Sequence, residues 1–375
     1  MNNQPFKRNN LAQAYCDNLQ GNGITNAASG LFLAGPRRVG KSTFLLNDLI
    51  PEAKQRHWTT VYVDLWANKR ADPALLITEA VKAAILSYKS KLGKLIKRFK
   101  VQKINILKTV ELDFSQPGLP ENITITDLLK EFVILANKPI LLIIDEAQHA
   151  LTSKNGINAM FSIKSARDQI NIKSSTPQLM LVLTGSNRDK LAQLIIKKEQ
   201  PFFGSEVTTF PLLNRDFTDD LTDKVNNALE VNNQFNKNDM WEAFQMIGHR
   251  PEILRQLIGR VAINNDAESF SKLLKQDAFI WHSQIWQEFE NEFNQLPALH
   301  QSILTLLIKE KHDWSPFSES SMQYYQQSIN QPRLSIATVQ TAIQSLREKG
   351  FIWQSSRGVY ALEDESFAQW FKHTH

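Results

Sequence analysis

Cysteine is almost absent from this sequence: Cys16 is the only one in 375 residues. No internal disulfide can form, which excludes a disulfide-stapled secreted scaffold. A reducing compartment is the simplest reading, and we expect a cytoplasmic protein. For Cys16 itself, the simplest role is that of a small, partly buried side chain.

Long apolar runs are also lacking. The N-terminal MNNQPFKRNN has no apolar core of the kind found in a signal peptide, and the longest apolar stretch, 132–144, is broken by Asn137, Lys138 and Pro139. A membrane-spanning helix needs about 20 consecutive, predominantly apolar residues. We therefore expect neither a signal peptide nor a membrane span.

A strong excess of charge of one sign is missing as well, since the formal net charge is only +5. This charge permits a nucleic-acid partner without requiring one. The composition, 42% hydrophobic and 22% charged, is that of a globular protein with sizeable cores. The chain is too long for one compact core, because single domains usually contain about 100 to 200 residues.

A glycine-bounded loop lies between a short apolar strand, LFLAG at 31–35, and a helical pattern, FLLNDLIPEA. Its GxxxxGK[ST] spacing lets backbone N–H groups surround phosphates while the helix N-terminus adds its positive end. We predict that Lys41 contacts the β- and γ-phosphates of ATP or ADP and that Ser42 holds Mg²⁺. The predicted nucleotide-binding residues of the loop are Gly35, Pro36, Arg37, Arg38, Val39, Gly40, Lys41, Ser42 and Thr43. Side chains at the variable positions, Arg37 and Arg38 among them, commonly face solvent.

A second strand, ILLII at 140–144, ends in two carboxylates, Asp145 and Glu146. Such a continuous apolar run is typical of the centre of a parallel sheet. We predict that Asp145 holds Mg²⁺ through water and that Glu146 is the general base for the attacking water. The alternative is that Asp145 and Glu146 are only the polar residues at which the strand ends.

A third strand, LMLVLTG at 179–185, is predicted beside the one that carries Asp145. Thr184, Ser186 and Asn187 are the candidates to sense the γ-phosphate or the attacking water. Ser and Asn after a strand are also ordinary turn residues.

Two further apolar runs, at 59–65 and 207–212, bring the number of predicted strands to five. Strands that alternate with helical patterns predict an α/β fold with a doubly wound parallel sheet and the ligand at the carboxyl ends of the strands. We expect the acidic strand to be the neighbour of the strand before the loop.

Several motifs together resemble one superclass: GPRRVGKST, LLIIDEAQ, LVLTGSN, PFFGS at 201–205 and GHRPEIL at 248–254. The chain is similar to AAA+ proteins, and more closely to the signal-transduction (STAND) and archaeal-type ATPases related to the origin-recognition ATPases. The resemblance implies an ATPase with a helical lid whose glycine-and-proline motif touches the nucleotide. The matching positions are Gly248, His249, Arg250 and Pro251. Arg250 is then a second sensor of the γ-phosphate, with a solvated surface charge as the alternative.

The chain departs from this pattern in one respect. The family often ends the PFFGS segment in arginine, whereas this chain has Ser205, so an arginine finger must come from elsewhere. Arg188 and Arg215 are candidates. A homo-oligomer is therefore less strongly indicated than for a ring-forming AAA+ protein.

The segment 82–108, within an insertion of about 82–125, contains basic residues and no acidic one. These are Lys82, Lys89, Lys91, Lys94, Lys97, Arg98, Lys100, Lys103 and Lys108. Apolar residues at helical spacing from Leu92 to Phe99 predict an amphipathic helix, followed by a strand-like VELDF. The candidate partners of this basic segment are nucleic acid, an anionic lipid surface and an acidic protein. The alternative is that the basic face contacts only solvent.

The C-terminal segment predicts a winged helix: helices at 299–309, 318–329 and 335–349, then a hairpin at 351–355 and 359–363. In a DNA-bound form the third helix would present Thr338, Thr341, Gln344 and Arg347, while Arg357 on the wing meets phosphate. The balanced charge beyond residue 301 keeps docking of a protein partner open. The predicted domains are an α/β ATPase domain at 1–212, a lid at 213–297 and the winged helix at 298–375.

We predict an enzyme that converts ATP and water to ADP and phosphate. As a DNA-associated switch, it would close its lid on ATP and reopen it after hydrolysis, and the winged helix would report the state. A nucleotide-bound scaffold or signalling protein that docks a partner is the alternative, and a transcriptional regulator is a third. Replication, transposition, defence and signalling all use this architecture, and fold does not choose among them.

Overall fold

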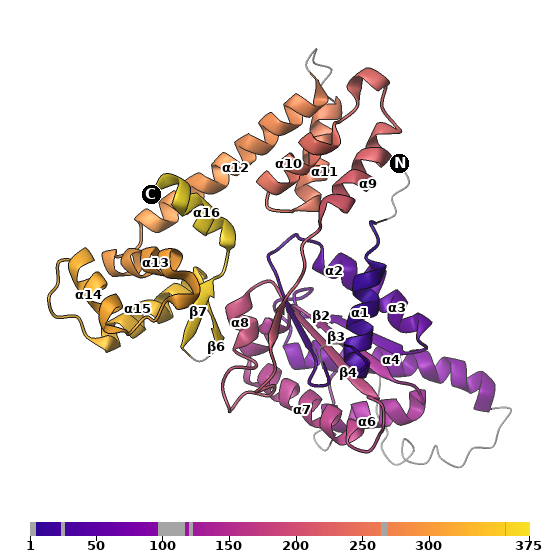
Figure 1. The fold of residues 1–375 in the computed structure, drawn as a ribbon. Helices are drawn as coiled ribbons and strands as arrows, with labels where there is room; N and C mark the ends of the chain where they lie inside the picture. The colour runs from indigo at the N-terminus through magenta and orange to yellow at the C-terminus, as the bar shows by residue number, and fades with distance from the viewer. Residues whose placement is uncertain (1–4, 24–26, 97–116, 120–122, 264–268, 357) are drawn as a thin grey trace.

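The computed structural model describes residues 5–23, 27–96, 117–119, 123–263, 269–356 and 358–375, without the side chains of 89–96 and 312. A five-stranded sheet lies at the centre of the N-terminal part (Figure 1). Its strands are β1 (Leu31–Ala34), β2 (Thr59–Asp64), β3 (Ile140–Asp145), β4 (Leu179–Gly185) and β5 (Val207–Thr209). All neighbours pair in parallel in the order β2-β3-β4-β1-β5, which confirms the predicted α/β fold.

Two details of the sheet differ from the prediction. The acidic strand β3 is not the neighbour of β1, because β4 lies between them and pairs with both. The fifth strand ends at Thr209 rather than Leu212. Phe210 N still donates to Ala34 O at 2.7 Å, whereas Pro211 has no N–H with which to continue the ladder.

Helices cover both faces of the sheet (Figure 1). One face carries α1 (Asn9–Gln20), α2 (Lys41–Phe44), the π-helical turn η1 (Leu45–Leu49) and α3 (Ile50–Gln55), and the other carries α4 (Pro73–Ile96), α6 (Ile125–Ala136) and α7 (Lys154–Asn171). Leu31 and Leu33 of β1 pack on the face that carries α1, whereas Phe32 packs on the face that carries α4. Every residue of β3 is buried because both faces are covered, which explains its apolar run without alternation.

A proline explains the π-helical turn that follows α2. Pro51 has no N–H to donate to the carbonyl of Asn47, four residues earlier. That carbonyl instead accepts a hydrogen bond from Lys7 Nζ at 2.6 Å, and the backbone N of Arg8 donates to Asp48 Oδ1 at 3.0 Å. The N-terminal segment is thus fastened to the helix after the glycine-bounded loop.

The basic insertion is described only in part. Its beginning belongs to α4, where Lys82 is buried and donates to Glu79 Oε1 at 3.0 Å and to Gly118 O at 3.2 Å. Lys82 is therefore not part of a basic surface, contrary to the prediction. The remaining basic residues from Lys97 onward and the strand-like 110–114 lie outside the described residues, as does Arg357 of the predicted wing.

A second hydrophobic core follows the sheet. It is shared by α9 (Arg215–Asn226), α10 (Lys237–Met246), α11 (Pro251–Ile263) and the beginning of α12 (Phe270–Asn294). Phe270 and Leu274 of α12 lie in this core, whereas Phe293 lies in the next one. One long helix thus links the helical lid region to the C-terminal module (Figure 1). In the part of the chain that is described, no helix is long and apolar enough to cross a bilayer.

The C-terminal module forms a third core. Its elements are α13 (Ala298–Glu310), α14 (Glu319–Ser328), α15 (Ile336–Lys349), the antiparallel strands β6 (Ile352–Ser356) and β7 (Val359–Leu362), and α16 (Glu365–Thr374). The side chain of Ser335 accepts from Thr338 N at the start of α15, and Gly350 ends the helix in a left-handed conformation, as predicted. The sequence did not predict α16, which packs Trp370 and Phe371 into this core.

Candidate active site

The glycine-bounded loop joins β1 to α2, and Gly40 is the N-cap residue of α2. Gly40 has a φ of 90° directly before α2, a conformation that glycine adopts without strain. Gly35 packs closely against β5's continuation, since a Cβ there would lie 3.2 Å from Phe210 Cβ. The backbone conformation thus favours glycine at position 40, and the close approach of Phe210 leaves little room for a side chain at position 35.

Lys41 turns back into this loop. Its side chain is buried, and Nζ donates to Gly35 O at 2.6 Å and to Pro36 O at 2.7 Å. Burial lowers the pKa of Lys41, while the carboxylates of Glu146 and Asp145 act in the opposite direction. The ammonium is thus bonded to the loop carbonyls and lies within electrostatic range of the predicted acidic pair.

Asp145 gathers hydroxyl groups from three elements. Its side chain is 1% exposed. Ser42 Oγ donates to Oδ2 at 2.7 Å and Tyr62 Oη to the same oxygen at 2.9 Å, while Thr184 Oγ1 donates to Oδ1. The structure therefore brings together the two predicted metal ligands, Ser42 and Asp145, across the intervening strand β4.

Sequence reasoning missed Tyr62, which lies on β2 beside β3. Burial raises the pKa of the Tyr62 phenol, and the neighbouring Asp145 carboxylate raises it further, so the phenol remains a donor. The signal in the sequence was a tyrosine, with its polar hydroxyl, within the apolar run TTVYVDL.

Glu146 stands in the left-handed region, with a φ of 54°, immediately after β3. A non-glycine residue in this region is strained, and such strain is concentrated at functional sites. Its Oε2 accepts from Ser186 Oγ at 2.7 Å and from Gln148 Nε2. Ser186 is thus the candidate that meets the predicted base, and Gln148, in the 3-10 helix η3 (Ala147–Thr152), is a further contact that the sequence did not suggest.

Asn187 follows β4 and makes a local contact in this structure. It is the N-cap of α8 (Arg188–Ala192), and its side chain accepts from Lys190 N at 2.7 Å. This contact is the ordinary capping role of asparagine. Of the three candidate sensors, Thr184 contacts Asp145, Ser186 contacts Glu146 and Asn187 caps the next helix.

The donor atoms at the ends of β2, β3 and β4 suit Mg²⁺. Hydroxyl and carboxylate oxygens are the ligands that this hard cation prefers, and it is usually held by one or two carboxylates together with phosphates and water. Among the described residues no cluster of three or more His, Cys, Asp or Glu is placed to enclose a metal. The residues therefore fit a magnesium ion that is shared with a phosphate ligand.

A cavity of about 320 Å³ opens beside the loop, between the sheet domain and the lid helices. Its lining residues come from the N-terminal segment, the loop and the helix after it, and the lid: Pro5, Phe6, Arg8, Val39, Gly40, Thr43, Phe44, Asp48, Leu213, Phe217, Pro251, Glu252 and Arg255. The Arg8 guanidinium lies 5.0 Å from the Phe210 ring centre and 5.7 Å from that of Phe44. The cavity is largely apolar with a few polar groups, which is typical of a base-binding pocket.

From the predicted lid, Pro251 lines this cavity and Arg250 does not. The Arg250 guanidinium lies 4.9 Å from the centre of the Trp281 ring on α12. Arg255, one turn further along α11, lines the cavity instead. The predicted second sensor, Arg250, thus contacts α12, and the sequence analysis did not single out Arg255.

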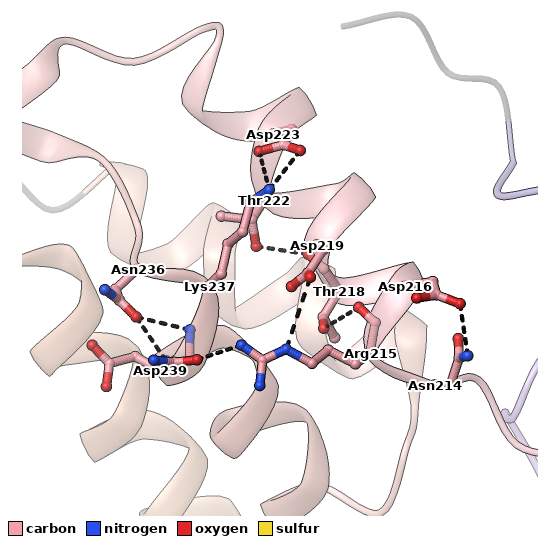
Figure 2. A network of polar contacts seen from close by, with 11 residues as sticks. Asn214, Arg215, Asp216, Thr218, Asp219, Thr222, Asp223, Asn236, Lys237 and Asp239 are labelled. Atoms are coloured by element: carbon pink, nitrogen blue, oxygen red, sulfur yellow. Dashed lines mark hydrogen bonds and ion pairs between the residues drawn. The ribbon is translucent and has the colours of Figure 1, made fainter.

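The two candidate arginine fingers are engaged elsewhere. Figure 2 shows Arg215 at the start of α9 within a polar network of the lid, where its guanidinium contacts Asn238 and lies 3.8 Å from Asp219. Arg188 packs on the C-terminal module: its backbone N donates to Glu363 Oε1, and its guanidinium lies 5.8 Å from the Trp353 ring centre.

The C-terminal module also contacts α8 through Asp189. Arg347 Nε donates to Asp189 Oδ1 at 2.8 Å, and Gln354 N donates to the same oxygen at 3.1 Å. The ion pair is almost closed to solvent, with side-chain exposures of 14% for Arg347 and 4% for Asp189. Arg347 is therefore occupied within the chain, whereas Thr338, Thr341 and Gln344 on the same helix are exposed.

No protein-family model matches this chain, and no curated protein matches it. Among solved structures, the chain is similar to a Walker-type ATPase of Pyrococcus abyssi, with a TM-score of 0.50, 20% identity and coverage of 92% of this chain and 91% of the other. It is also similar to the ADP form of the Aeropyrum pernix ORC2 protein, with a TM-score of 0.56, 14% identity and coverage of 100% and 97%. These likenesses confirm the predicted α/β P-loop fold.

Proposed function

We propose that this chain is a Mg²⁺-dependent ATPase that works as a nucleotide-controlled switch associated with DNA. The observation that carries the proposal is the contact between Ser42 Oγ and Asp145 Oδ2 at 2.7 Å, since it joins the residue after the buried Lys41 to the residue before Glu146. The ADP form of the similar Aeropyrum protein supports an adenine nucleotide as the ligand.

In this proposal the loop amides and Lys41 bind the polyphosphate, and the base lies in the cavity of about 320 Å³ beside Thr43 and Phe44. Ser42, and Asp145 through water, hold Mg²⁺, which when bound neutralises charge on the phosphates. When the polyphosphate binds, Lys41 replaces its hydrogen bonds to the loop carbonyls with hydrogen bonds to phosphate oxygens.

Glu146 is the base in the hydrolytic step. It takes one proton from water while the water oxygen forms a bond to the γ-phosphorus. The bond between the γ-phosphorus and the bridging oxygen breaks, and its electron pair leaves with ADP. Ser186 and Gln148 both hold Oε2 of Glu146, so we assign Oε1 to the water.

The link from the site to the C-terminal module supports a switch. Ser186 contacts the proposed base, and Asp189, three residues later, holds Arg347 and the backbone of β6. A shift of this segment on hydrolysis would therefore move the contacts that hold the C-terminal module. We propose that the module is a winged helix and that the exposed face of α15, with Thr338, Thr341 and Gln344, meets DNA; Arg347 belongs to the internal contact.

Phosphate release from ATP and Mg²⁺, measured with and without duplex DNA, tests this function. We expect DNA to change wild-type turnover by about fivefold, a usual size for coupling between sites. Arg347→Ala should retain turnover and lose the response to DNA, because it removes one partner of the buried pair with Asp189. Arg333→Ala, at an exposed arginine of the same module, is the matched control for lost charge.

The outcomes separate the proposals. Binding of ATP without phosphate release would favour the nucleotide-bound scaffold. Turnover that DNA leaves unchanged would favour a module that docks a protein partner. An Arg347→Ala chain that responds to DNA as the wild type does would contradict the coupling through Asp189.

Tyr62→Phe is expected to weaken the metal site. The substitution removes the phenol that donates to Asp145 Oδ2 at 2.9 Å and leaves the ring in place. We expect the Mg²⁺ concentration for half-maximal turnover to rise about tenfold, as is usual for lost outer-shell contacts. Tyr88→Phe is the matched control, since its phenol contacts Thr59 at 3.0 Å, away from Asp145. Equal effects of both variants would contradict a role of Tyr62 at the metal.

A further inference from the structure

The two adjacent arginines of the loop point in different directions. The Arg37 guanidinium lies 4.9 Å from the centre of the Trp66 ring, which follows β2. Arg38 has a φ of 65°, and its Nε lies 3.9 Å from Glu252 on α11, with both side chains exposed. Arg38 therefore faces the lid, whereas Arg37 faces the side of the site that carries the carboxylates.

Trp66 holds Arg37 at that side. The backbone N of Trp66 donates to Asp64 Oδ1 at 2.8 Å, which fixes the chain after β2. The indole also lies 4.3 Å, between ring centres, from His149, three residues after the proposed base Glu146. Lys69 Nζ lies 3.7 Å from the centre of the same indole.

Electrostatics agrees with this placement. Burial lowers the pKa of Lys41 and of His149, and the charge of Arg37 contributes to both shifts. The guanidinium is therefore within electrostatic range of the loop ammonium and of the turn behind Glu146. A ligand that places its γ-phosphate between Lys41 and Glu146 would also lie near Arg37.

The other arginines considered for this role are engaged. Arg188 packs on Trp353, Arg215 belongs to the lid network and Arg250 lies over Trp281. Arg255 lines the cavity assigned to the base. Of these arginines and Arg37, only Arg37 lies both on the phosphate loop and on the side of Glu146.

We infer that Arg37 is an intramolecular catalytic cation of the proposed ATPase. Its guanidinium leaves the Trp66 ring and donates to γ-phosphate oxygens as charge develops on them, the role that an arginine finger supplies in related phosphoryl transfers. An exposed cation–π contact is weak, whereas a bidentate bond to phosphate is strong, so the exchange is favourable. Arg37 forms no covalent bond and transfers no proton in the step written above. The inference rests on the proposed ATPase function.

The matched pair Arg37→Ala and Arg70→Ala tests the inference, because both arginines are exposed and Arg70 lies outside the phosphate loop. We measure the affinity for Mg²⁺ and ATP and the rate of a single turnover, with thermal melting to check folding. Arg37→Ala is expected to reduce the rate on the order of 100-fold, below the 10³ to 10⁵ of a dedicated arginine finger. Its affinity, and both values for Arg70→Ala, should stay within about twofold of wild type, as for most surface changes. Arg37→Lys should recover part of the rate, since it restores charge without the planar fork.

Equal rates for Arg37→Ala and wild type, or equal losses in the two alanine variants, would overturn the inference. Mixing Arg37→Ala with Glu146→Gln tests whether the arginine acts within its own chain. No recovery of turnover supports an intramolecular cation, and recovery in the mixture would show that a second copy supplies it. Wild-type chain that binds ATP but releases no phosphate would remove the proposed function and the inference together, whereas turnover that survives Arg37→Ala removes the inference alone.

Discussion

Glu146→Gln is expected to bind ATP like the wild type and to lose hydrolysis by about 10²- to 10⁴-fold, the usual contribution of general-base catalysis. Glutamine has nearly the same shape, and its amide oxygen still accepts the hydrogen bond that Ser186 Oγ donates at 2.7 Å. The amide cannot take a proton from water at neutral pH. Binding is measured by calorimetry and turnover by phosphate release.

Glu199→Gln provides the matched control, because this exposed glutamate lies away from the carboxyl ends of the strands. It removes the same charge from the chain and should leave turnover within about twofold, as expected for a surface change. Ordinary turnover in Glu146→Gln would remove the assigned base and leave the water without an activating group.

Lys41→Ala is expected to weaken ATP binding by about 100-fold or more, because a hydrogen bond from a charged donor contributes about 1.5–3 kcal/mol. The substitution removes the buried ammonium that donates to Gly35 O and Pro36 O. The loop therefore also loses two hydrogen bonds that stabilise its conformation. Both effects act on the same site. Titration of the chain with a fluorescent ATP analogue measures the loss.

Lys54→Ala is the control for this variant, since Lys54 is exposed on α3, the helix that continues from the loop. A circular dichroism spectrum that matches the wild type separates lost binding from lost folding. ATP affinity that survives in a folded Lys41→Ala chain would contradict the assignment of this loop to the polyphosphate.

The sequence predicted those features that local patterns encode. The glycine spacing at 35–40 and the continuous apolar run before Asp145 depend on residues close together in the chain, and both have the structure expected of them. The caps of α15 at Ser335 and Gly350 are of the same kind. Such signals act over one turn or one strand and need no knowledge of the rest of the fold.

Features that depend on the order of the strands could not be read in the same way. Nothing local in LMLVLTG indicates that β4 separates β1 from β3. For that reason the sequence left Thr184 among three equal candidates and missed Tyr62, whose contact with Asp145 requires β2 to be the neighbour of β3.

The sequence also could not predict how the helices are oriented or how the C-terminal module packs, because both depend on contacts between distant residues. Arg250 and Arg255 lie on or beside one helix, and only the packing of α11 and α12 decides which of them lines the cavity. The pair of Asp189 and Arg347 joins residues far apart in the chain, so Arg347 read as a free residue of a recognition helix. Long-range packing, rather than propensity, determines these positions.

The central claim is that a polyphosphate bound by Lys41 meets the acidic pair after β3, so that Glu146 activates water against it. Single-turnover release of phosphate from prebound ATP, with Mg²⁺ supplied to start the reaction, measures this most directly in wild-type and Glu146→Gln chains compared side by side. The account predicts release by the wild type and retention of bound, uncleaved ATP by the variant. Release at the same rate from both chains would contradict it.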